Sequence, residues 1–173
     1  MAGSLIKIAE TTISSAVASV TLTGIDSTYD VYMVAFNNVV PTTNASVLRE
    51  RVTVSGTADT SANYDETGKF FRTNTTFSDI SRTNLTYFTQ STNSTNSTDR
   101  GENAIYYLFN FNNSSEYSYT TSENSGYNQA GYLAGTQMGG VHTVAQSCDG
   151  IQFFYDNGST IASGTFKLYG LKK

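Results

Sequence analysis

Apolar and polar residues alternate with a period of two along most of the chain, which is typical of β-strands. Around residues 16–22 the even positions are apolar, and this predicted strand ends at Gly24. The stretch 30–39, DVYMVAFNNV, is apolar on both faces, which predicts a central strand covered on both sides, in a sandwich or at a subunit interface. The stretch 103–112, NAIYYLFNFN, is the most apolar run and predicts a second central strand.

The remaining pattern predicts an all-β chain. Further strands are expected at 46–56, 68–73, 85–90, 116–121 and 140–146. Near the C-terminus, two apolar runs flank Asn157-Gly158, the strongest short-range signal for a tight turn, so a final β-hairpin is expected. We therefore predict ten or more strands in a single antiparallel β-sandwich or jelly-roll-like domain over residues 1–173.

One segment stands apart from this alternation. Residues 91–101, STNSTNSTDRG, contain no apolar side chain, so nothing in them offsets the entropy lost on ordering. This composition predicts an exposed polar loop.

Composition limits the classes of partner and of chemistry. The 12 Tyr and 10 Phe supply enough apolar surface for a core without disulfides, and the single cysteine, Cys148, is expected to be a small buried residue. The net charge of −4 provides no basic patch, so we expect no nucleic-acid partner. The chain has neither a signal-peptide pattern nor about 20 consecutive apolar residues, so we expect synthesis in a cytoplasm and no membrane span.

Residues for catalysis or metal binding are sparse. His142 is the only histidine and lies in a strand-like run beside Val141, which favours a structural role. With one His and one Cys, the chain cannot form a multi-histidine metal site or a Cys/His zinc site. Residues 59–68 contain oxygen ligands but lack the spacing of a known calcium loop. We therefore predict no catalytic residues, no metal, no cofactor and no enzymatic activity.

The densest charge cluster within a predicted strand is Arg49, Glu50 and Arg51, with Glu50 on the apolar side. Two interpretations remain open for this cluster. It forms either solvated or cross-strand ion pairs, or ion pairs between subunits.

A second candidate surface combines tyrosines with small polar residues. Its members are Tyr117, Tyr119, Tyr127, Asn128 and Tyr132. Aromatic rings beside small hydrogen-bonding residues make good contact surfaces for a sugar or a neighbouring protein. The alternative is that these side chains pack in the core.

Two stretches, Val20–Thr43 and Asp149–Lys173, resemble a family of small phage virion proteins that are frequent in phages of cyanobacteria and other aquatic bacteria. The motifs that carry the resemblance are Thr-Gly-Ile-Asp at 23–26 and Ser-Gly-Thr-Phe-Lys-Leu-Tyr-Gly at 163–170. The resemblance implies a β-sandwich that forms a homotrimer and has no enzymatic activity.

These features lead to two functional expectations, both with the chain located in a virion. The first is a structural protein displayed on the phage particle, either a head decoration (cement) protein or a short fibre. Residues 1–12 would then form a short docking segment for the major capsid protein or for a tail or fibre adapter. The alternative is a tail-tip receptor-binding module that recognises a host surface polysaccharide through the tyrosines between Tyr117 and Tyr132.

Overall fold

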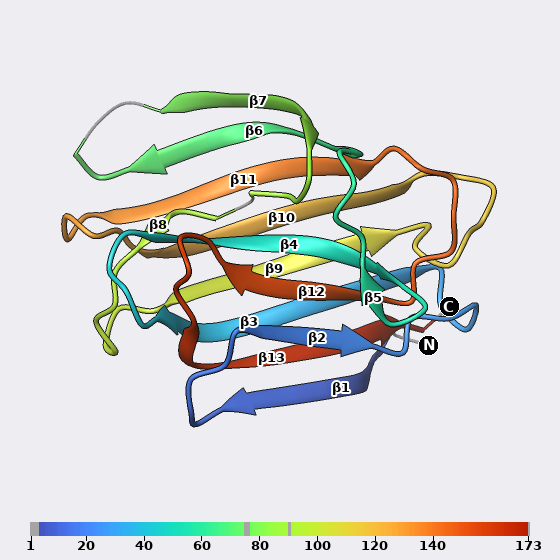
Figure 1. The fold of residues 1–173 in the computed structure, drawn as a ribbon, viewed down its shortest axis with the longest axis horizontal. Coiled ribbons are helices and arrows are strands. Elements are labelled where there is room, and N and C mark those ends of the chain that lie inside the picture. The colour runs from blue at the N-terminus through green and yellow to red at the C-terminus, as the bar shows by residue number, and fades with distance from the viewer. Residues whose placement is uncertain (1–3, 75–76, 90, 173) are drawn as a thin grey trace.

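The structure is a computed structural model that describes residues 4–74, 77–89 and 91–172. Thirteen antiparallel strands form two sheets that face each other, and the described residues contain no helix. Figure 1 shows the narrower sheet lying over part of the wider one, with β6 and β7 extending beyond it. The predicted all-β sandwich is confirmed.

The wider sheet has eight strands. In spatial order they are β1 (Leu5–Ile13), β13 (Ile161–Leu171), β3 (Val31–Pro41), β9 (Glu102–Phe109), β10 (Ser118–Tyr127), β11 (Leu133–His142), β6 (Tyr64–Arg72) and β7 (Ser78–Leu85). The narrower sheet has the order β2 (Ser19–Thr23), β12 (Gly150–Tyr155), β4 (Ser46–Val54) and β5 (Thr57–Ala58), and the short β8 (Asn93–Ser94) also pairs with β4.

The hydrophobic core lies between the two sheets. Its centre is a cluster of four buried aromatic rings whose neighbouring centroids lie 5.3 to 5.8 Å apart. The four are Phe36 on β3, Tyr106 on β9, Phe153 on β12 and Phe166 on β13. Burial of each ring contributes roughly 1.5–3 kcal/mol to stability. The predicted strands at 30–39 and 103–112 are therefore central, since each contributes a ring to the middle of the core.

The predicted final hairpin is wrong, although its turn has the expected geometry. Asn157 and Gly158 have φ angles of 55° and 71°, and the Ser159 N–H donates to the Asp156 carbonyl at 3.1 Å. The strands on either side separate, because β12 pairs with β2 and β4 whereas β13 pairs with β1 and β3. The tight turn therefore carries the chain from one sheet to the other.

Other predicted boundaries also need correction. Residues 86–89 of the expected strand at 85–90 belong to no strand, and the preceding β7 is polar and mostly exposed, so it left no apolar signal. The strand expected at 140–146 ends at His142 and begins already at Leu133.

The N-terminal segment takes part in the sheet. Residues 1–3 lie outside the described residues, and most of the remainder forms β1, which pairs with β13 at the edge of the wider sheet. Leu5 and Ile6 stay 49% and 41% exposed. A docking role for this segment stays a prediction, but deletion of residues 1–9 would also remove half of an edge strand.

Because Gly158 has a positive φ and open space around its missing Cβ, its role can be tested separately from packing. We expect Gly158→Ala to lower the free energy of unfolding by about 1 kcal/mol, since an L-residue is strained in this region. Gly139→Ala is the matched control, because Gly139 has ordinary dihedrals and a nearest neighbour at 4.0 Å. Urea unfolding of both variants checks this, and equal effects would contradict the turn assignment.

Candidate functional site

The exposed tyrosines do not form one surface. Tyr117, just before β10, and Tyr119, near its start, have exposures of 44% and 46%. Tyr127 and Tyr132 lie at and beyond its other end with exposures of 39% and 40%. Eight residues separate Tyr119 from Tyr127 on one straight strand, a distance of about 27 Å at the usual rise per residue. A single small ligand cannot contact both pairs.

Asn128 is not a surface contact residue, which corrects the sequence-based prediction. It is only 5% exposed, and its Oδ1 accepts hydrogen bonds from the backbone N–H groups of Ala130 and Tyr132, both at 3.0 Å. The side chain therefore shapes the turn between β10 and β11 and has no oxygen turned to solvent for a partner.

The charge cluster of β4 is engaged within the chain. Arg49 forms an ion pair with Asp156 at 2.9 Å, and its guanidinium lies over the ring of Tyr87, 4.6 Å from the centroid. Arg51 donates from Nε to the Thr86 carbonyl at 3.0 Å. Both arginines therefore contact the segment that follows β7. Whether either also reaches a second subunit stays a prediction.

Glu50, by contrast, is buried and cannot form a surface ion pair between subunits. Its side chain is fully inside the fold and accepts a hydrogen bond from the Tyr106 hydroxyl at 2.6 Å. The backbone of Glu50 also exchanges two hydrogen bonds with Phe88, at 3.1 and 2.9 Å. This corrects the prediction for Glu50, whose place on the apolar side of the strand decided its burial.

We call residues 86–89 and 91–94 the plug segment. It follows β7, includes β8, and lies over the inner face of the wider sheet, beside the edge of β4 (Figure 1). A second glutamate, Glu66 on β6, accepts a hydrogen bond from the Thr89 N–H at 2.6 Å. Glu66 is 4% exposed and also forms an ion pair with Arg82 of β7.

A third glutamate, Glu102 on β9, holds the other end of the plug segment. It accepts hydrogen bonds from the hydroxyls of Ser91 and Ser94 at 2.7 and 2.8 Å, and from the Thr92 N–H at 3.4 Å. Ser91 is 7% exposed, and Thr92 and Ser94 are each 2% exposed. The predicted exposed loop at 91–101 is therefore wrong in its first part, because a buried carboxylate supplies the acceptors that its polar groups need.

Burial raises the pKa of Glu102 to about 7, although the hydrogen bonds from Ser91, Ser94 and Thr92 act in the opposite direction. Near neutral pH this carboxyl group is thus close to half-protonated inside the fold.

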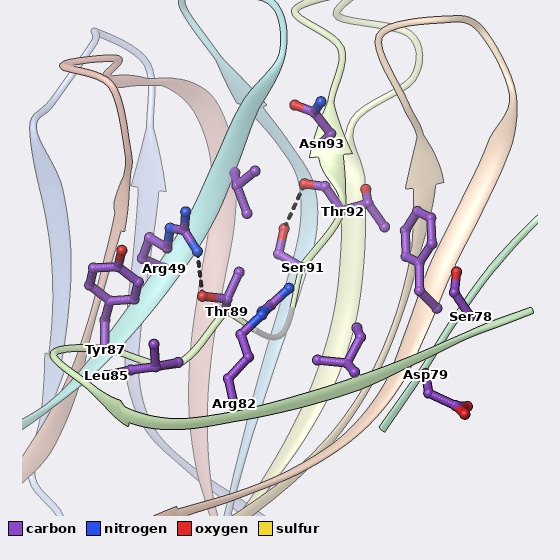
Figure 2. Close-up of a pocket in the computed structure, with 13 residues that line it drawn as sticks. Arg49, Ser78, Asp79, Arg82, Leu85, Tyr87, Thr89, Ser91, Thr92 and Asn93 are labelled. Atoms are coloured by element: carbon purple, nitrogen blue, oxygen red, sulfur yellow. Dashed lines mark hydrogen bonds between the residues drawn. The ribbon is translucent and has the colours of Figure 1, made fainter. Parts of the chain in front are cut away.

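The plug segment forms one wall of a cleft with a volume of about 590 Å³. Figure 2 shows this wall facing Arg82, Leu85 and the other β7 residues, with Arg49 of β4 at the side. The lining residues are Val47, Arg49, Phe70, Ser78, Asp79, Ile80, Arg82, Leu85, Tyr87, Thr89, Ser91, Thr92 and Asn93. This size falls within the usual range for small-molecule pockets.

The cleft is equipped for hydrogen bonding. The carboxylate among the residues that line the cleft belongs to Asp79, which is on the exposed side of β7 and pairs with Lys69.

His142 and Cys148 lie away from the cleft. His142 is fully buried with Nε2 3.0 Å from Asp59, and burial raises the pKa of the buried Cys148 thiol to about 11. Among the described residues, no group of three or more potential ligands is close enough to hold a metal ion.

Sequence reasoning missed the cleft because its wall was assigned to a strand and an exposed loop. The signal that could have found it is a glutamate at an inward position of a strand. A carboxylate there requires buried donors, and the hydroxyl-rich stretch 89–94 is well suited to supply them.

Glu102→Gln tests the role of the buried carboxyl. In the wild type, ionisation costs more in the folded than in the unfolded state, so Glu102's contribution is full below about pH 4.5 and falls as the pH rises to about 7. This loss amounts to roughly 3 kcal/mol. Glutamine cannot ionise, and its amide can still bond the same hydroxyls.

Between pH 4.5 and pH 8 we therefore expect the free energy of unfolding of Glu102→Gln to rise by roughly 3 kcal/mol relative to that of the wild type. Urea titration at each pH measures this difference. Burial lowers the pKa of His142 in both proteins, so its contribution cancels in the difference. Glu123→Gln, an exposed glutamate of β10, controls for loss of a charge. Parallel curves for wild type and Glu102→Gln would refute the assignment.

No described helix is both long enough and apolar enough to cross a bilayer. Comparison with protein-family models, with curated proteins and with solved structures found no match to this chain.

Proposed function

We propose that this chain is a structural protein displayed on the surface of a bacteriophage particle, as a head decoration protein or short fibre, and that it assembles with copies of itself. The observation that carries self-assembly is an apolar patch on the outer face of the wider sheet, the face turned away from the narrower sheet. It surrounds Met33, which is itself only 8% exposed, and its members are Val31, Ala35, Ile105, Tyr107, Phe109, Tyr119 and Val141.

Strand register places these side chains on one continuous surface. Met33 lies opposite Tyr107, and Phe109 lies between Val31 and Tyr119 in neighbouring strands. Ile105 and Tyr107 are 45% and 39% exposed although their strand is central in the sheet. The sequence of β3 is that of a strand covered on both faces, yet no described strand is layered on its outer face.

A second copy of the chain is a suitable partner for this patch. A sheet face in contact with water normally carries polar residues, and a contiguous apolar patch marks an interaction site. The charged group nearest the centre of the patch, Glu123, is already bonded to Gln137 at 2.8 Å. This hydrogen bond holds the Glu123 side chain in place but leaves its negative charge, which an interface through the patch must accommodate.

The location on a phage particle is supported by the resemblance of residues 23–26 and 163–170, and the segment that follows the first motif contacts the second. Asp26 accepts a hydrogen bond from the Tyr32 hydroxyl through its carbonyl, at 2.6 Å. Tyr29 stacks edge-on against Tyr32 and covers Gly170, where any Cβ would lie 2.3 Å from its ring. Residues of both motifs thus take part in packing and hydrogen bonds within the fold, and this role agrees with a structural protein.

Receptor binding through the tyrosines is the weaker alternative. The four exposed rings lie in two distant pairs and Asn128 is buried, so the predicted surface is not assembled.

Ile105→Lys tests self-assembly, because a lysine in the centre of the patch would need to be desolvated at the interface. We expect the wild type to have the mass of an oligomer, a homotrimer by the resemblance, and the variant that of a monomer in light-scattering measurements. Ile6→Lys is the matched control, with a similar exposure of 41% at the far edge of the sheet. A monomeric wild type, or an oligomer lost only in Ile6→Lys, would contradict the proposed interface.

Immunogold labelling of intact phage tests the location. We expect antibody against this chain to label the particle, over the head for a decoration protein or at the tail for a fibre. The absence of label on all particles would refute the assignment to the virion surface.

A further inference from the structure

Arg51 of β4 carries a positive charge that forms no ion pair with the described residues. The residues on either side of it in the strand are buried, so its partly exposed side chain lies on the outer face of the narrower sheet. Ion pairs hold three other arginines of the described chain, namely Arg49, Arg82 and Arg100. Arg51 is therefore a cation whose counter-charge is not supplied by its own fold.

Three contacts fix the direction of the Arg51 side chain. Its Nε donates a hydrogen bond to the Thr86 carbonyl at 3.0 Å. Its guanidinium lies 4.3 Å from the ring centroid of Phe154 and 5.8 Å from that of Tyr87. These two rings meet edge to face, with centroids 6.1 Å apart. The side-chain entropy of Arg51 is therefore lost largely on folding, and little remains to be lost when a partner binds.

The two Nη atoms of Arg51 are the part of the guanidinium that a partner can reach. Neither has a hydrogen-bond partner among the described residues, and unlike Arg49 Nε neither is buried. Arg72 also forms no ion pair, but its own Nε is buried. The Nη edge of Arg51 can donate two parallel hydrogen bonds, and a carboxylate has two oxygens at the matching spacing.

The surroundings of Arg51 favour a single carboxylate on a protein over other anions. One unpaired guanidinium compensates one negative charge, and the net charge of −4 on the chain opposes the approach of a polyanion. Gln152 lies opposite Arg51 in the strand register, and Thr21 lies opposite Gln152, so uncharged polar residues border the site. Arginine and aromatic rings within a polar border are typical of the contact residues in protein interfaces.

We propose that Arg51, with the rings of Phe154 and Tyr87, is a contact site for an aspartate or glutamate side chain of a different protein. The carboxylate accepts hydrogen bonds from the two Nη atoms, and the CH₂ groups beside it contact the rings. The choice of a protein other than a second copy rests on the proposed function, which places self-assembly on the opposite face of the sandwich.

The test is titration of the full chain with N-acetylglutamate methylamide, which carries one carboxylate, followed by NMR at low ionic strength because salt screens an exposed contact. We expect saturable shifts of the Arg51 Nε–H signal and of the amides of residues 49–51, 86–87 and 152–154. N-acetylglutamine methylamide is the matched neutral probe and should give none. Glucuronate and inorganic phosphate represent a sugar acid and a phosphate, and both should bind more weakly.

Arg51→Gln removes the charge, and we expect it to weaken binding of the glutamate probe about tenfold, the effect of one hydrogen bond to a charged group. Arg51→Lys keeps the charge but loses the planar guanidinium, so it should also weaken binding. Arg100→Gln is the matched control. Arg100 likewise lies over a ring, 5.5 Å from the centroid of Tyr127, but it is paired with Asp99, so its loss should leave binding unchanged.

The proposal is overturned if the glutamate probe gives no saturable shifts, if the shifts map elsewhere, or if glucuronate or phosphate binds more tightly. Equal shifts with the glutamine probe would also overturn it, since the carboxylate would then not be recognised. Arg51→Gln should keep the light-scattering mass of the wild type, whereas a lower mass would identify a second copy as the partner and overturn the choice of a different protein. The titrations do not bear on the oligomer or on its place in a virion.

Discussion

The contact between the plug segment and three buried glutamates determines how the two unequal sheets form one sandwich. Eight strands face a narrower sheet, so the inner face of β10, β11 and β6 extends beyond it. That face presents buried polar residues, namely Ser118, Thr120, Ser122, Asn124 and Thr136. The plug segment, bonded to the carboxylates of Glu66 on β6 and Glu102 on β9 and to the backbone of Glu50 on β4, covers part of it instead.

This solution has an energetic cost and a structural benefit. Removing a carboxyl group from water is expensive, which is the cause of the raised pKa of Glu102. In return, its oxygens accept bonds from three groups of one short stretch and so fix where that stretch lies. Apolar contacts are not directional and would not select one register for an irregular segment. The buried carboxylates thus specify the position of the cleft wall.

Much of the fold could be predicted from local pattern, whereas the site could not. The apolar runs of β3 and β9 indicated central strands, and the positive φ of Asn157 and Gly158 follows from turn chemistry. Which sheet each strand joins depends on distant partners, so the predicted hairpin at this turn was wrong. Burial of Ser91 depends on Glu102, and no local rule for a hydroxyl-rich stretch anticipates a carboxylate on another strand.

In the plug segment, backbone groups bond to the sheet while side chains line the cleft, which explains how one short stretch can do both. Thr89 and Thr92 are held to glutamates through their backbone N–H groups, which every residue except proline possesses. Anchoring through the main chain leaves the Thr92 side chain uncommitted, and the same holds for Oδ1 of its neighbour Asn93. A segment held only by apolar side chains would have to turn them inward and present its backbone to the cleft. Bonds to the main chain therefore fix the position of the segment whatever side chains it carries at these positions.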